Sequence, residues 1–172
     1  IRWTRAPTVE HYEISLPSSS VACEPSSVTI KACANTSSPC TSTVTNLGGQ
    51  SATLGTSAGA LAATTLTFDA TGVAGTTLSH PSAGNGSMVT VTLSAEQTAA
   101  SNPGQCCPNG ASCSVSNSCS TTFNSAGFII AEAAGGASVT LPAQTAGTTS
   151  GRYYLRAVRT STNTGACSAA LT

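Results

Sequence analysis

Short segments in which apolar and polar residues alternate recur along the first half of the chain. In the clearest of them, MVTVTLSA at Met88–Ala95, the valines and the leucine fall on one side and the threonines on the other. A period of two residues, with threonine toward solvent, predicts a strand that is buried on one face. Such segments return about every ten residues, between turns rich in Gly, Asn and Asp, which favours a small antiparallel sandwich.

The first strand of this sandwich is predicted at Glu10–Leu16. Its alternation assigns Tyr12, Ile14 and Leu16 to the core, and His11, Glu13 and Ser15 to solvent. Further strands are predicted at Val28–Ala32, Thr41–Leu47, Ala52–Thr56, Thr64–Phe68, Val73–Ser79 and Ser87–Glu96. The residues before them, Ile1–Val9, hold Trp3 and a proline that disfavours helix, so we expect an extended arm outside the sandwich.

The pattern changes near Gln97. The long stretch Thr98–Ser120 holds four cysteines and no strand pattern, and a run of that length needs covalent staples to be ordered. Strands are predicted again at Thr121–Ala131, Ala137–Pro142 and Arg152–Thr160. We therefore divide the chain into an arm (1–9), a sandwich (10–97), and a cysteine-rich loop with additional strands (98–172). The last part either forms a second small β domain or completes the first.

The segment RYYLRAVR is the richest in Arg and Tyr. As a strand it would bury Tyr153, Leu155 and Ala157, and would expose Arg152, Tyr154 and Arg156. Arg and Tyr are favoured at interfaces, so Arg152, Tyr154 and Arg156, together with Trp3, are the candidate interface residues. The alternative is an edge strand protected by its charges.

The eight cysteines are an even number and include no CxxC pair: Cys23, Cys33, Cys40, Cys106, Cys107, Cys113, Cys119 and Cys167. Structural zinc sites need closely spaced ligands, so we predict disulfides rather than a metal site. Disulfides in turn predict that the protein lies outside the reducing cytosol. Cys33 and Cys40 enclose a short polar loop and are the most plausible local pair. The four cysteines between 106 and 119 are expected to knot their loop internally, or to tie it to Cys23 and Cys167. Sequence alone leaves the connectivity open.

The composition excludes some classes of binding partner. The formal net charge is zero and only 7% of residues are charged. Nucleic acid and anionic membrane surfaces are therefore not expected as partners, because both need a basic patch. No apolar run approaches the roughly 20 residues that span a bilayer. We expect an exported protein, either mature and processed or a segment of a longer chain.

Catalytic chemistry is not predicted. A hydrolytic triad could draw on His11, His80 and Asp69, but no GxSxG elbow is present, and Asp69 opens a DATG turn where it is expected to accept its own backbone N–H groups. The glutamates are scattered, and a single aspartate does not supply a calcium site. No enzyme activity, cofactor or metal is expected.

Three segments resemble bacterial immunoglobulin-like domains of the invasin and intimin type: TLGTSAGAL at Thr53–Leu61, FDATGVAGTTL at Phe68–Leu78, and MVTVTLSA. Nearly the whole chain also resembles part of the MshQ-like proteins, large surface proteins associated with mannose-sensitive haemagglutinin type IV pili. The motifs that carry this likeness are HYEI at His11, CEPSSVTIKACA at Cys23, SNPGQCC at Ser101, TTFNSAGFI at Thr121 and AGTTSGRYYLRAVRTSTNTGAC at Ala146.

The resemblance implies an immunoglobulin-like, disulfide-stabilised β-sandwich in an exported, non-enzymatic surface protein. We expect a structural or adhesive element of the bacterial cell surface, with itself in a homopolymer, or neighbouring domains of a larger protein, as partner. One version makes it a pilus or filament subunit whose Ile1–Val9 arm adds a strand to a neighbour's sheet. The alternative is a tip adhesin module that recognises sugar or protein through the cysteine-rich loop.

Overall fold

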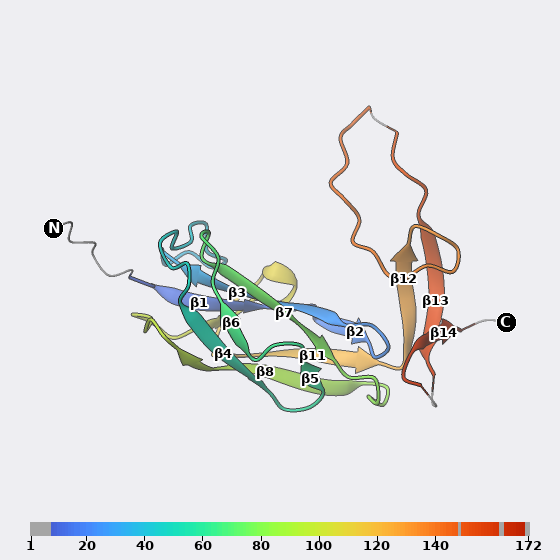
Figure 1. Ribbon diagram of the computed structural model, residues 1–172, viewed down its shortest axis with the longest axis horizontal. Coiled ribbons are helices and arrows are strands. Elements are labelled where there is room, and N and C mark those ends of the chain that lie inside the picture. The colour runs from blue at the N-terminus through green and yellow to red at the C-terminus, as the bar shows by residue number, and fades with distance from the viewer. Residues whose placement is uncertain (1–7, 148, 162–163, 171–172) are drawn as a thin grey trace.

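The computed structural model describes residues 8–147, 149–161 and 164–170, which form an elongated β-sandwich with a smaller sheet at one end (Figure 1). The first sheet of the sandwich has the order β10-β9-β1-β3-β7-β5 and the second has the order β2-β11-β8-β4-β6. The first contains β10 (Ser114–Val115), β9 (Gln105–Cys106), β1 (His11–Ser15), β3 (Ser26–Cys33), β7 (Val73–Ser79) and β5 (Ala60–Leu61). The second contains β2 (Ser19–Val21), β11 (Ser118–Asn124), β8 (Ser87–Glu96), β4 (Ser51–Thr56) and β6 (Thr65–Thr67).

The core lies between these two sheets. Apolar side chains alternate inward along both, and β8 spans the residues that the sequence predicted, with its two valines fully buried. Tyr12 and Phe68 stack across the core with ring centroids 5.7 Å apart. The predicted all-β, disulfide-stabilised sandwich is confirmed. Within the described residues, no helix is long and apolar enough to cross a membrane.

The stretch that looked irregular in sequence supplies part of this sandwich. β9 runs parallel to β1, β10 turns back on β9, and the short 3-10 turn η1 (Pro108–Gly110) lies between them. β11 pairs with β8 in the other sheet. β9 and β10 are only two residues long, too short for any period to be visible.

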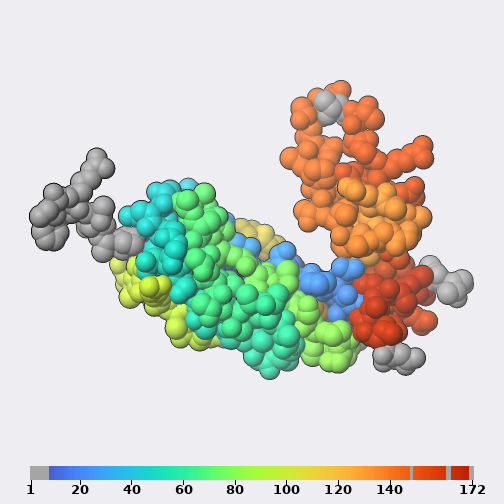
Figure 2. Space-filling view, in the orientation of Figure 1, coloured from blue at the N-terminus to red at the C-terminus, as the bar shows by residue number. Residues whose placement is uncertain are grey.

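A third sheet follows, with the order β12-β13-β14: β12 (Ala126–Ala131), β13 (Tyr154–Thr160) and β14 (Cys167–Ala169). It stands at the end of the sandwich, and the long segment between β12 and β13 extends away from both (Figures 1 and 2). The segment 98–172 thus divides between the sandwich, which takes β9 to β11, and this separate sheet.

Three predictions about strands are wrong. His11 and Glu13 were assigned to solvent, yet both are buried, because the loop after β3 and the segment around β9 cover that side of β1. Thr41–Leu47 makes one isolated bridge, between Cys33 and Thr43, rather than a strand. Ala137–Pro142 has no strand, although Val139 donates one hydrogen bond to the carbonyl of Ile130.

Candidate functional site

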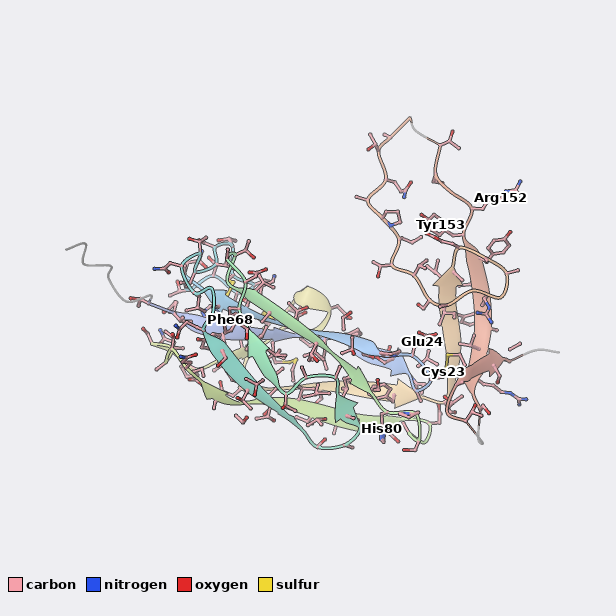
Figure 3. All side chains as sticks on the ribbon, in the orientation of Figure 1. Cys23, Glu24, Phe68, His80, Arg152 and Tyr153 are labelled. Carbon is pink, nitrogen blue, oxygen red and sulfur yellow. A yellow bond between two sulfur atoms is a disulfide. The ribbon has the colours of Figure 1, made fainter. Side chains whose placement is uncertain are left out.

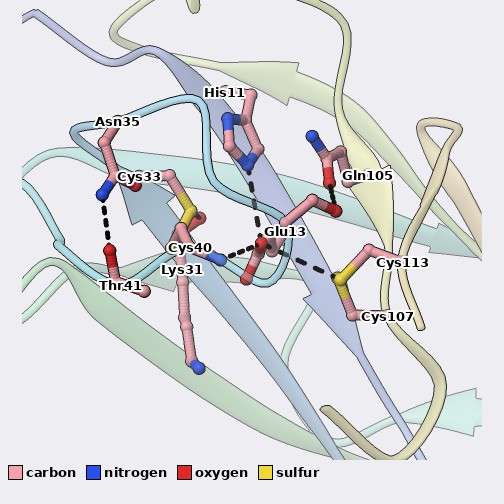
Figure 4. The surroundings of a disulfide bond; sticks show 11 residues. His11, Glu13, Lys31, Cys33, Asn35, Cys40, Thr41, Gln105, Cys107 and Cys113 are labelled. Atoms are coloured by element: carbon pink, nitrogen blue, oxygen red, sulfur yellow. Dashed lines mark hydrogen bonds and ion pairs between the residues drawn. A yellow bond between two sulfur atoms is a disulfide. The ribbon is translucent and has the colours of Figure 1, made fainter. Parts of the chain in front are cut away.

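The most unusual feature of the sandwich is a buried acid–base pair on β1. The Nε2 atom of His11 lies 3.5 Å from Oε1 of Glu13, and both side chains are at most 2% exposed. The same carboxylate oxygen accepts the backbone N–H of Cys40 at 2.5 Å, whereas His11 Nε2 has no hydrogen-bond partner (Figure 4). Burying a polar group is costly unless it is hydrogen-bonded, and Glu13 accepts the N–H group of Cys40.

Two disulfides cover this pair. Cys33–Cys40 closes the loop whose N–H reaches Glu13, and the sulfur of Cys113, in the Cys107–Cys113 bond, lies 3.9 Å from Glu13 Oε1. The predicted local pairing of Cys33 with Cys40 is therefore confirmed. Ligand atoms of His11, Glu13 and Cys33 all lie within 4.8 Å of one another, but sulfur in a disulfide does not offer the thiolate that metals bind. The geometry is that of a structural pair, His11 and Glu13, buried beneath two disulfide-closed loops.

A third disulfide joins the two sheets of the sandwich. Cys106 belongs to β9 in the first sheet and Cys119 to β11 in the second, and their bond bridges 13 positions of sequence. Together with Cys107–Cys113 it knots the cysteine-rich loop internally, which was one of the two arrangements expected. Like the inter-sheet disulfide of immunoglobulin domains, it bridges the two layers of a sandwich.

The fourth disulfide, Cys23–Cys167, ties the third sheet to the sandwich across 144 positions of sequence. Cys23 lies just after β2, close to the junction with the third sheet, and Cys167 begins β14 (Figure 3). A Cβ added at Gly127 would stand 2.6 Å from a methyl carbon of Val21, so β12 packs closely against the end of β2. A pocket of about 450 Å³ lies at the same junction. Small and hydroxyl residues line it: Pro81, Ser82, Ala83, Ser125, Thr160, Ser161, Thr164 and Gly165.

The candidate interface residues do not form one exposed face. Trp3 lies outside the described residues. Arg152 precedes β13 and is exposed, Tyr154 is 39% exposed, and Arg156 is half-buried and donates to the carbonyl of Gly136. Figure 3 shows Arg152 projecting away from the sheet. The side chain of Arg156 is thus hydrogen-bonded within the protein and does not form part of an exposed interface.

The prediction that β13 buries Leu155 is wrong, because this side chain is 71% exposed, whereas Tyr154 is exposed as predicted. In an antiparallel pair, residues directly opposite each other share a face. Tyr154, Arg156 and Val158 therefore share the face of Ile129 and Ala131, and that face is covered by the loop after β12 and by the end of the sandwich. Segments far away in the sequence cover this face of β13. The alternation within RYYLRAVR therefore cannot predict which face is buried.

The opposite face carries exposed apolar residues that sequence reasoning missed. Phe128 on β12 is 69% exposed and lies directly opposite Ala157, while Ile130 lies opposite the exposed Leu155. The strand AGFIIA carries a signal for this, since its apolar residues do not alternate with polar ones and it therefore presents two apolar faces.

Asp69 and His80, which were considered for a hydrolytic triad, both make structural contacts. Oδ1 of Asp69 accepts the N–H groups of Thr71 at 2.8 Å and Val73 at 3.0 Å, as predicted for its turn. Hydrogen bonds, first from the Thr71 side chain and then from the Val73 backbone, lower the pKa of Asp69. His80 packs edge-on against Phe123 with ring centroids 5.8 Å apart, near the opposite end of the sandwich from Phe68 (Figure 3).

Two family models match the chain. One, described as a domain of unknown function, DUF8613, matches residues 9–104, which is more than half of the sequence. The chain belongs to the DUF8613 family. A second model matches residues 103–172 of this DUF8613 protein. It describes the first Ig-like domain of DUF6701, another domain of unknown function. No curated protein and no solved structure matches.

The DUF8613 match runs from just before β1 to the residue before β9, and the Ig-like match covers β9 to β14. The chain therefore contains an Ig-like domain, a fold common in cell-surface proteins. Four disulfides with no free cysteine also fit an extracellular protein.

Proposed function

We propose that the protein is a structural element of the bacterial cell surface, related to the MshQ-like pilus-associated proteins, and that its role is mechanical and not enzymatic. The observation that carries the proposal is the Cys23–Cys167 disulfide. It joins two points of the chain that enclose β3 to β13, which is nearly all of the sandwich and most of the third sheet.

This disulfide determines which strands can bear tension. When the chain is pulled from positions outside the pair, the force passes from β1 and β2 through the sulfur–sulfur bond into β14. Every strand between Cys23 and Cys167 is bypassed, so loss of its packing cannot lengthen the molecule. A covalent bypass of this kind suits a protein that holds its shape on a cell surface, where the medium keeps disulfides oxidised.

The other three disulfides support the same role. Cys106–Cys119 keeps the two sheets together, while Cys33–Cys40 and Cys107–Cys113 close the loops over the buried His11–Glu13 pair. Loops closed in this way expose less flexible chain to proteases.

The proposal is tested by labelling source cells with an antibody raised against residues 8–170. Labelling of intact cells, equal to that of permeabilised cells, is the expected result. Signal that appears only after permeabilisation would contradict a surface role. A cytosolic protein labelled in parallel shows that the intact cells are sealed.

A finer version of the proposal makes the chain a filament or pilus subunit. The arm at Ile1–Val9 would add a strand to the sheet of a neighbouring copy, and repetition of that head-to-tail contact would generate a fibre. Residues 1–7 lie outside the described part of the chain. Deletion of residues 1–9 should abolish fibres seen by electron microscopy, and fibres of unchanged length would exclude donation by this arm.

The alternative function is a tip adhesin that binds sugar or protein through the cysteine-rich loop. In its favour, two disulfides fix the loop, Val115 is 73% exposed, and Ser112 has a positive φ of 51°, uncommon for a residue other than glycine. Alanine substitutions across Asn109–Ser118 that spare the cysteines should abolish adhesion of cells if this alternative holds. Unchanged adhesion would exclude it.

A further inference from the structure

The third sheet has one covered face and one open face. Ile129, Ala131 and Val158 are buried on the covered face, whereas Phe128 and Leu155 on the other face are about two-thirds exposed or more. A sandwich needs a second layer over such a face, because a sheet buries its apolar side chains against another element. The described residues supply no such layer for the open face of β12 and β13.

The open face is contiguous and has a charge at each end. Phe128 and Ala157 are direct partners, Ile130 and Leu155 are the next pair on the same face, and these four residues form an apolar centre. Arg159 stands opposite Ala126 at one end of the pair of strands. At the other end Glu132, exposed, follows β12 directly and continues the alternation of Phe128 and Ile130.

These two charges make the face complementary to itself. If a second copy docks face to face about a two-fold axis that lies in the interface at right angles to the strands, the strands of the two sheets run in opposite directions. Arg159 of each copy then lies over Glu132 of the other, while the apolar centres cover each other. No described residue forms an ion pair with either side chain in the single chain. Such a contact is isologous, so it closes at two copies.

We propose that the open face of β12 and β13 is a homodimer interface, occupied by the same face of a second copy. This inference goes beyond the surface role proposed above and does not depend on it. The strands are six and seven residues long, so the contact is small. Interfaces at the low end of the size range are transient, so we expect a weak and reversible dimer.

The first test is sedimentation equilibrium of the oxidised full chain over roughly 5 µM to 1 mM, a range that brackets a small transient interface. The mass should rise from one chain toward two with wild type, and should stay at one chain with Phe128→Ser/Leu155→Ser. The control is Met88→Ser/Val115→Ser, which removes two apolar side chains of equal exposure (70% and 73%) from the sandwich surface and should leave dimerisation unchanged. Circular dichroism and a count of free thiols establish that each variant is folded and oxidised.

The second test uses the charges. Arg159→Glu alone and Glu132→Arg alone should each weaken dimerisation about tenfold or more, because each puts like charges opposite each other. An equimolar mixture of the two variants should dimerise at least as well as wild type, since every contact between them pairs Arg with Glu. A monomeric wild type at all concentrations would overturn the proposal and leave the face to another segment or another protein. A mixture no better than its components would overturn the two-fold arrangement.

Discussion

Replacing both Cys23 and Cys167 by serine removes the covalent link between the sandwich and the third sheet without leaving an unpaired thiol. Oε1 of Glu24, the residue after Cys23, lies 3.3 Å from the sulfur of Cys167. The variant therefore isolates the effect of closing this long loop. The matched control is Cys33→Ser/Cys40→Ser, which opens a loop with a sequence separation of only 7.

The expected magnitude follows from the entropy that each cross-link removes from the unfolded chain. For a separation of 144 residues the loop-closure relation gives about 5 kcal/mol at 25 °C. For a separation of 7 it gives about 2.4 kcal/mol. The first value is comparable with the whole stability of a typical domain, which is about 5–15 kcal/mol.

Urea unfolding followed by circular dichroism measures both variants against wild type. We expect the free energy of unfolding to fall by about twice as much for Cys23→Ser/Cys167→Ser as for the control. A variant already unfolded in buffer meets the same expectation. If the long-loop variant loses no more than the control, the third sheet unfolds independently of the sandwich, and the reasoning is refuted.

Three further perturbations test the core and its turns. Burial, and then Glu96, raises the pKa of Tyr12 to about 12, so stability that is present below pH 10 should be lost as pH rises through about 12, by up to roughly 2.7 kcal/mol in urea unfolding. Asp69→Ala should lower the melting temperature at neutral pH, and the difference should vanish as pH falls through the lowered pKa of Asp69, because its turn hydrogen bonds need the carboxylate. Gly72→Ala should cost about 2 kcal/mol or more, because φ is +75° and the new Cβ would lie 2.5 Å from the carbonyl oxygen of Val44.

The tests at Tyr12 and Gly72 have their own controls. Tyr12→Phe should remove the loss of stability above pH 10, and a persistent loss would assign it to another group. Glu96→Gln should keep most of the effect, because burial is its larger cause. Gly49→Ala, with φ of +86° and open space around the new Cβ, should cost less than Gly72→Ala. Equal costs at the two glycines would contradict the predicted clash.

The strands that the sequence predicted correctly are those whose own residues decide their burial. β8 alternates over its whole length and packs one face on the core, so its bounds and its buried side were both visible. β1 was placed correctly, but His11 and Glu13 were assigned to solvent because loops from distant parts of the chain cover them. Alternation of apolar and polar residues predicts a strand with one buried face. It does not predict a strand whose two faces are both covered.

The candidate site was less predictable for the same reason. Cysteine spacing indicated disulfides and the short Cys33–Cys40 loop, but a pairing across 144 positions depends on the fold that brings its ends together. The burial of Leu155 was predicted wrongly because the loop before β13 covers Arg156 and leaves Leu155 open. The unalternating strand AGFIIA was the one local signal that this sheet has two apolar faces.

Force–extension measurement on a single oxidised molecule tests the mechanical account most directly. With handles attached outside the pair, the wild type should show no unfolding step for the segment between Cys23 and Cys167. Cys23→Ser/Cys167→Ser, with the other disulfides intact, should lengthen by on the order of 400 Å more, at about 3.5 Å per released residue. Equal extension of the two proteins under oxidising conditions would contradict the claim that this disulfide carries the tension past the sandwich.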